Sequence, residues 1–153
     1  MNYIAFIAGL PEIAWDDRKL SLTVSEFRTQ LKDYISGEDE KLVDLFFLPN
    51  DNHQVLRLLN KQEADVSLPT VYPVKLLEEE VAEPDRMIPA YLREFITDFK
   101  GEHLRYEQVP ENVLSWMYYD YMLETDNLLV RSFAEFSMNL KNLVTALNAR
   151  KYG

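Results

Sequence analysis

The last quarter of the chain carries six large apolar residues spaced alternately four and three positions apart. These residues are Leu129, Phe133, Phe136, Leu140, Leu143 and Leu147. At about 100° of rotation per residue, this spacing places all six on one face of an α-helix. The pattern predicts a helix over 127–153 whose apolar face packs against other helices, with Asp126 as its N-cap. We expect four of the six side chains to be buried, namely Phe133, Phe136, Leu140 and Leu147.

The remainder of the sequence also favours helix, because it has only four glycines and amphipathic segments recur along it. Thr23 and Glu26 form the signature of a capping box, and Gly37 is placed to end the helix that this box starts. Residues 3–8 fit either a short buried strand or a first helical turn. The further helices expected after this point cover about 38–48, 52–60, 74–82, 89–100 and 110–123. The predicted fold is therefore an all-α bundle of six or seven helices, with or without a short extended N-terminus.

The composition, with 47% apolar residues among 153, indicates one ordinary domain with a real core over residues 1–153. The stretch most like a linker is 61–73, where Pro69 and Pro73 disfavour a continuous helix. No apolar run approaches the ~20 residues that span a bilayer, and no basic segment precedes the apolar residues 4–10. The absence of cysteine excludes disulfides and thiolate metal sites. We therefore expect a cytoplasmic protein without a membrane span.

Charge is distributed unevenly along the chain. Residues 76–126 carry 13 acidic and 4 basic side chains, a net −9, whereas residues 127–153 carry 1 acidic and 4 basic side chains, a net +3. An acidic middle argues against nucleic acid as a partner, since binding to phosphates needs a basic stripe. The basic last helix fits either an acidic partner or the ordinary preference of Arg150 and Lys151 for a helix C-terminus.

A catalytic or cofactor site finds no support in the sequence. His53 and His103 stand alone, and neither the spacing of a helical metal site nor a glycine-rich phosphate loop occurs. The acidic run from Glu78 to Asp85 points to several helix faces, as a solvated surface does. We expect no enzyme activity, no bound nucleotide, no metal and no cofactor.

Two groups of residues are candidates for binding a protein partner. Trp116 and Tyr119 lie in the densest aromatic stretch, which fits either a thick core helix or an exposed anchor for a partner. Asn139, Asn142 and Asn148 follow at steps of three and six, which we interpret as lying near one face of the last helix. Asn142 is expected to be the most buried of the three and to bond to a preceding helix. All three are alternatively plain surface.

Residues 139–153 also resemble a repeated element of the C subunit of V-type and archaeal-type rotary ATPases, called subunit d in eukaryotes. The positions that match or are chemically close are Asn142, Thr145, Leu147, Ala149, Arg150, Lys151 and Gly153. Two positions depart together, because Asn139 stands where the family has Asp and Asn148 stands where it has Arg. A neutral amide pair thus replaces a charged pair.

A second resemblance covers most of the chain. Residues 3–11, the Ser/Thr-rich segment 20–26, residues 118–121 and the ending 148–153 are similar to an uncharacterised bacterial family encoded beside V-type ATPase subunits. Members of that family run on past this point, so the resemblance leaves open that these residues are the N-terminal portion of a longer C-subunit-like protein.

The resemblance implies a non-catalytic role in a bacterial V-type ATPase or ATP synthase, and through it in ion transport. The subunit would couple the central shaft to the membrane ring and would contact central-stalk and membrane-ring subunits. It would then be peripheral to the inner membrane through that complex. The alternative is a stand-alone helical module that binds an unknown protein, which an exposed patch at Trp116 and Tyr119 would favour.

Overall fold

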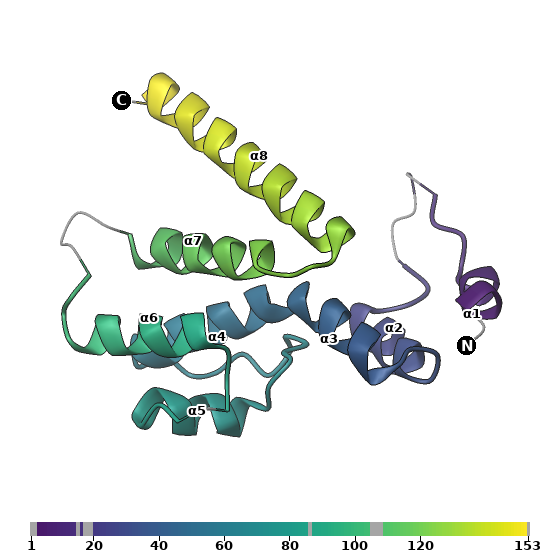
Figure 1. Ribbon diagram of the computed structural model, residues 1–153, viewed down its shortest axis with the longest axis horizontal. Helices are drawn as coiled ribbons and strands as arrows, with labels where there is room; N and C mark the ends of the chain where they lie inside the picture. The colour runs from purple at the N-terminus through teal and green to yellow at the C-terminus, as the bar shows by residue number, and fades with distance from the viewer. Residues whose placement is uncertain (1–2, 15, 17–19, 86, 105–108, 153) are drawn as a thin grey trace. The chain divides into compact units, whose positions relative to one another are not determined.

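The computed structural model describes residues 3–14, 16, 20–85, 87–104 and 109–152, and within these ranges it is helical without any strand. Eight helices lie in the described part of the chain (Figure 1). The order is α1 (Tyr3–Gly9), α2 (Val24–Lys32), α3 (Gly37–Leu45), α4 (Leu48–Leu59), α5 (Val74–Ala82), α6 (Ala90–Lys100), α7 (Pro110–Leu123) and α8 (Leu128–Tyr152). The predicted all-α bundle is confirmed, and the N-terminal segment that fitted a strand or a helical turn is the helix α1. None of the helices in these ranges is both long and apolar enough to cross a membrane.

The chain forms two compact units that divide between Asp44 and Leu45. The first unit is small, and its only buried apolar residue among the described ones is Phe6 of α1. The Phe6 ring packs against the rings of Phe27 and Tyr34, with centroids 5.8 Å and 4.9 Å away. Arg28 of α2 forms an ion pair with Asp44 of α3 at 2.6 Å.

The local signals that start helices act in the first unit largely as the sequence predicts. The Thr23 hydroxyl accepts from the Glu26 N–H at 3.2 Å, and the Glu26 carboxylate accepts from the Thr23 N–H at 2.8 Å, so the capping box is present. Gly37 was expected to end this helix, and that is wrong. The helix ends at Lys32, and Gly37 begins α3, because the Ser36 hydroxyl caps it by accepting from the Asp39 N–H at 3.4 Å.

The second unit is built around α4, which contacts α5, α6 and α7, while α7 also contacts α6 and α8. Figure 1 shows this order as successive layers from α5 to α8. The fully buried apolar side chains of this unit include Val55, Leu77, Leu92, Phe95, Ile96, Leu114 and Met122. Pro73 and Pro89 immediately precede α5 and α6, and Pro110 opens α7, so the prolines mark helix starts as expected.

The segment 61–73 contains no helix and is held against α4 by polar side chains of that helix. The buried Asp51 carboxylate accepts from the backbone N–H groups of Val71 and Tyr72, both at 2.9 Å. The buried Gln54 amide donates to the Asp65 carbonyl and accepts from the Asp65 N–H. The break expected between the helices at 38–48 and 52–60 lies at 46–47 instead, because α4 already begins at Leu48. That start brings Asp51 inside, where its charge is satisfied by backbone donors.

Two tyrosine hydroxyl groups link α6 and α7 to residues that precede them in the second unit. The Tyr91 hydroxyl donates to Asn52 Oδ1 at 2.7 Å, and the Tyr118 hydroxyl donates to the Leu45 carbonyl at 3.0 Å. Burial raises the pKa of both phenols, and the neighbouring Tyr119 raises that of Tyr118 further. Both therefore remain neutral hydrogen-bond donors across the physiological pH range.

Candidate functional site

The helix α8 contacts α7. Val130 and Ala134 are the buried residues of α8 among those described. The N-cap is Asn127, whose side-chain oxygen accepts from the Val130 N–H at 3.1 Å. The expected cap was Asp126, one residue earlier, and that expectation is wrong because the Asn127 side chain makes the capping hydrogen bond.

The six apolar residues at alternating spacing, Leu129 to Leu147, are all exposed, and we call them the α8 seam. Their exposed fractions run from 44% at Phe133 to 74% at Leu129. The predicted burial of Phe133, Phe136, Leu140 and Leu147 is therefore wrong. At about 100° per residue, the mean direction of the seam lies about 120° around the helix from the buried Val130 and Ala134, so the buried face of α8 is a different one.

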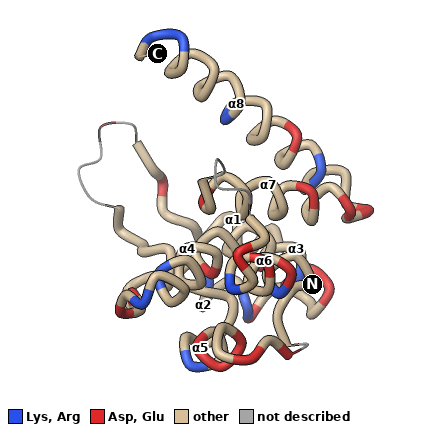
Figure 2. The backbone as a smooth tube through the Cα atoms, turned by 90° about the vertical axis from the view of Figure 1, so that its left-hand side faces the viewer, with Lys and Arg blue, Asp and Glu red and all other residues tan. Residues whose placement is uncertain are grey.

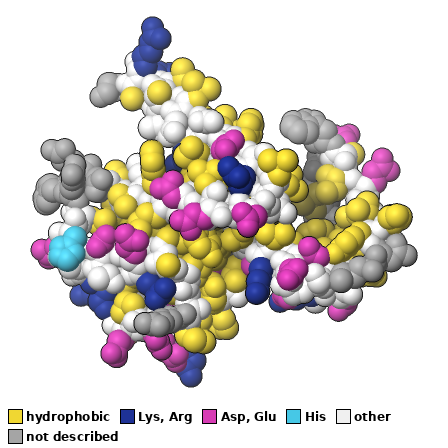
Figure 3. All heavy atoms as spheres, viewed as in Figure 1, with side chains coloured by type: hydrophobic (Ala, Val, Ile, Leu, Met, Phe, Trp, Pro, Cys, Tyr) yellow, Lys and Arg dark blue, Asp and Glu magenta, His cyan; other side chains and the backbone are white. Residues whose placement is uncertain are grey.

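A ring contact joins the seam to the segment between α3 and α4. The Phe133 ring meets the Phe46 ring edge-on, with centroids 5.0 Å apart. Beyond that turn, α8 rises away from α7, as Figures 1 and 2 both show, and hydrophobic side chains lie open on the part of α8 seen in Figure 3. A contiguous row of large apolar side chains left open in this way is typical of an interaction surface.

A small groove lies between α7 and the middle of α8, and it holds about 130 Å³. The Lys141 ammonium donates to the Ser115 hydroxyl at 2.7 Å and links its two walls. The groove is lined by Asn112, Ser115, Trp116, Tyr119, Met138, Lys141, Asn142 and Thr145. Three residues predicted for binding, Trp116, Tyr119 and Asn142, thus come together, and Trp116 is 56% exposed.

Four other residues of α8 that were predicted for binding do not line this groove, namely Asn139, Asn148, Arg150 and Lys151. Asn139, Asn142 and Asn148 are all exposed, so Asn142 is not a buried link to a preceding helix, and that expectation is wrong. Nine residues turn a helix by about 900°, which places Asn139 and Asn148 on opposite sides rather than near one face. Arg150 and Lys151 lie exposed in the last turn, where the Lys151 ammonium sits 4.9 Å from the centre of the Tyr152 ring.

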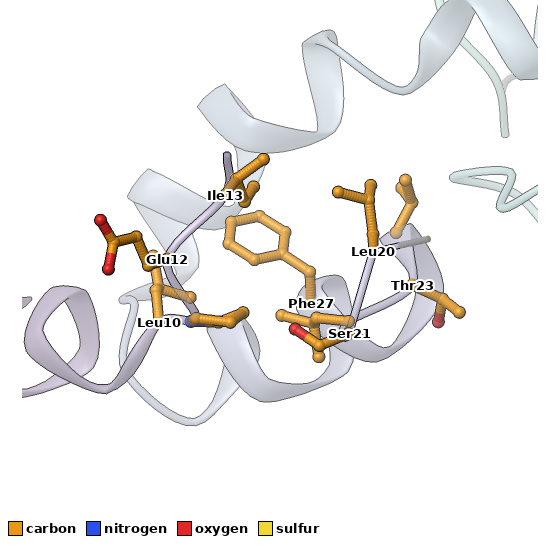
Figure 4. Close-up of a pocket in the computed structure, with 10 residues that line it drawn as sticks. Leu10, Glu12, Ile13, Leu20, Ser21, Thr23 and Phe27 are labelled. Carbon is orange, nitrogen blue, oxygen red and sulfur yellow. The ribbon is translucent and has the colours of Figure 1, made fainter. Parts of the chain in front are cut away.

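The first unit has an apolar groove that the sequence analysis missed. It holds about 230 Å³ between the segment after α1 and the start of α2 (Figure 4). Its walls include Leu10, Ile13, Leu20 and Phe27, and Glu12 is its charged lining residue. Apolar residues on both sides of the intervening loop are the sequence signal that would have indicated it, although residues 15 and 17–19 of that loop lie outside the described ranges.

One residue of the acidic run, Glu80 of α5, is buried and stabilises the fold, although the run was expected to be a solvated surface. Glu80 is 2% exposed, and its carboxylate accepts from the N–H groups of Asp85 and Met87 at 2.9 and 3.2 Å. His53 is exposed, and His103 lies 3.7 Å from Asp98. Within the described ranges, no three His, Asp or Glu side chains gather in a way that could hold a metal ion.

Comparison with known proteins assigns the chain to a family. The family model described as "Protein of unknown function (DUF2764)" matches residues 1–153, so the chain belongs to that family. The chain matches no curated protein and no solved structure.

Proposed function

We propose that this member of the DUF2764 family is a non-catalytic docking subunit that uses the α8 seam to bind a helix of a partner protein. The observation that carries the proposal is the exposure of six large apolar side chains on one face of a capped, 25-residue helix. Burying such a row against a partner helix releases roughly 25 cal/mol per Å² of apolar surface covered.

The partner that we propose is a bacterial V-type ATPase or ATP synthase, in which the chain acts as a C-subunit-like component between central shaft and membrane ring. The resemblance of residues 139–153 to an element of that subunit supports this assignment. The structure is compatible with it in one further respect. A coupling subunit needs rigid helices with docking faces and no reacting group, and α8 contacts α7 and buries Val130 and Ala134 while its seam stays exposed. In that complex the protein would be cytoplasmic and peripheral to the inner membrane.

A second candidate function is a stand-alone helical module with another protein partner. The exposed Trp116, beside Tyr119 in the α7–α8 groove, favours this alternative, because Trp and Tyr are enriched among the residues that dominate binding energy. The two candidates differ in which surface matters. The ATPase role uses the α8 seam, whereas the alternative uses the groove.

Affinity purification of the tagged protein from its native bacterium tests both candidates. We expect central-stalk and membrane-ring subunits of the ATPase to co-purify with the wild-type protein. The Leu143→Glu variant should lose them, because it places a charge in the middle of the seam. Leu128→Glu is the matched control, since it makes the same change at an exposed position of α8 outside the seam.

Two results would contradict the proposal. Wild-type protein that recovers no ATPase subunit, under conditions that preserve the complex, would refute the ATPase role. Recovery that Leu143→Glu leaves unchanged would refute the α8 seam as the docking surface. A different partner that is lost on Trp116→Ala and kept on Leu143→Glu would establish the alternative.

A further inference from the structure

The α8 seam is flanked by uncharged residues. Its six residues span three heptads, and the positions that flank them from 130 to 146 carry no charge. These flanking residues are Val130, Ser132, Ser137, Asn139, Val144 and Ala146. Charges at flanking positions normally select the partner and orientation in coiled coils. Selection must therefore come from the seam itself and from its two ends.

The seam reads the same in both directions, because its steps are four, three, four, three and four. Two copies laid antiparallel and centred on the level of Met138 match every seam residue with another. Leu129 lies level with Leu147 of the second copy, and the aromatic residues Phe133 and Phe136 lie level with Leu143 and Leu140. Each large ring thus meets a leucine, which is the alternation of large and smaller side chains that fills a helix interface.

The ends of the seam add complementary charge to this arrangement. In the antiparallel alignment, Arg150 and Lys151 of one copy lie level with the turn before α8 of the other. That turn carries Glu124 and Asp126, both exposed, and Figure 2 shows acidic residues there. Asp126 is available for this contact because Asn127 caps the helix instead.

A parallel alignment of two copies is opposed by the same residues. It would place Arg150 against Arg150 and Asp126 against Asp126, and it would align the two helix dipoles. It would also pair phenylalanine with phenylalanine at two levels and leucine with leucine at the other four. The buried face of α8, with Val130 and Ala134, lies about 120° from the seam, so the seam side is free for the second copy.

We infer that the chain outside any complex forms a dimer in which α8 pairs antiparallel with α8 of a second copy, covering the seam. This pairing protects the apolar row until a partner helix replaces the second copy. It concerns the same seam as the proposed docking role, but it does not rest on that role, since it is a property of the purified protein alone. Three heptads make a weak coiled coil, so the dimer should dissociate reversibly on dilution.

Sedimentation equilibrium of the purified protein tests the pairing. Between about 1 and about 200 µM, wild-type protein should pass from monomer to dimer, in the range of micromolar dissociation constants. Leu140→Glu should weaken the dimer at least about tenfold, because it introduces a charge into the centre of the seam. Leu128→Glu, about 100° away on the same helix, should leave it unchanged. Circular dichroism should show that all three proteins keep the same helix content.

Disulfide cross-linking tests the orientation of the two helices. Because the chain has no native cysteine, every disulfide must come from the introduced residues. Leu129→Cys and Leu147→Cys proteins are mixed and oxidised. The antiparallel dimer should give mainly the mixed product, because two copies of residue 129 lie about 27 Å apart at 1.5 Å per residue. Charge reversal supplies an independent check. Arg150→Glu should weaken the dimer, and adding Asp126→Arg should restore it.

Several outcomes would overturn the inference. A wild-type monomer throughout the concentration range would show that the seam has no affinity for itself, whatever the pull-down shows. A dimer that Leu140→Glu does not weaken would place the contact on another surface. Cross-linking of residue 129 to itself, or of residue 147 to itself, in preference to the mixed product would refute the antiparallel arrangement.

Discussion

At the scale of single residues, the buried carboxylate of Asp51 does most to fix the path of a segment without helix. It accepts two backbone hydrogen bonds, from Val71 and Tyr72, and so holds 61–73 against α4. Asp51→Asn replaces one acceptor oxygen by an NH₂ group that faces a backbone donor. We expect the free energy of unfolding to fall by about 1–3 kcal/mol, measured by urea denaturation. Glu63→Gln, at an exposed position, is the control and should change little.

The capping box at the start of α2 predicts a dependence on pH. Hydrogen bonds from the Thr23 N–H and then from its hydroxyl lower the pKa of Glu26 below its usual value of about 4.3. A carboxylate with a lowered pKa in the folded state stabilises that state above its unfolded pKa, and the contribution is lost as pH falls through the folded pKa. In Thr23→Ala, NMR titration should show the Glu26 pKa rising towards the usual value. An unchanged pKa would mean that the box is not formed in solution.

At the scale of elements, the exposure of the α8 seam reverses an expectation about stability. Leu140 is 48% exposed, whereas Leu114 of α7 is 1% exposed. The effect of a Leu→Ala substitution on stability can therefore be compared between an exposed and a buried position. Leu140→Ala should change the free energy of unfolding by less than about 0.5 kcal/mol at concentrations where the protein is monomeric. Leu114→Ala should cost about 2–5 kcal/mol. A cost of 2 kcal/mol or more at Leu140 would mean that the seam is covered within the single chain.

The spacing of apolar residues predicts where helices lie and which residues share a face, but not what covers that face. The bounds of α5, α6, α7 and α8 follow from prolines, caps and amphipathic spacing, because these act within a few residues of each other. The spacing of the seam correctly predicts one continuous face on α8. It does not say whether that face meets a helix or solvent, and the residues of α8 that are buried are Val130 and Ala134 instead.

The candidate site was predictable only in part for the same reason. Trp116, Tyr119 and Asn142 were selected for their chemistry, and they meet in the α7–α8 groove. Their meeting depends on how two helices cross, which no local pattern encodes. The N-terminal groove around Phe27 was missed because its lining residues come from segments whose apolar character was too short to interpret.

At the scale of the whole molecule, the apolar core is concentrated in one of the two units. Phe6 is the buried apolar residue of the first unit among those described, whereas the second unit contains the fully buried side chains from Val55 to Met122. A unit of about 40 residues without disulfide or metal is near the lower limit for independent folding. The helices α4 to α8 of the second unit contact one another. We therefore expect this unit to fold without the first unit.

This distribution predicts that residues 43–153 fold on their own. The fragment begins before Leu45 so that its carbonyl can still accept the hydrogen bond from the Tyr118 hydroxyl. We expect cooperative thermal unfolding, followed by circular dichroism, with a midpoint within about 5 °C of that of the whole chain, because few core contacts are lost. The matching fragment 1–42 should show no cooperative transition, since Phe6 with its aromatic neighbours buries too little apolar surface to offset the entropy of ordering. Loss of cooperative unfolding in 43–153 would mean that the first unit supplies part of the core of the second.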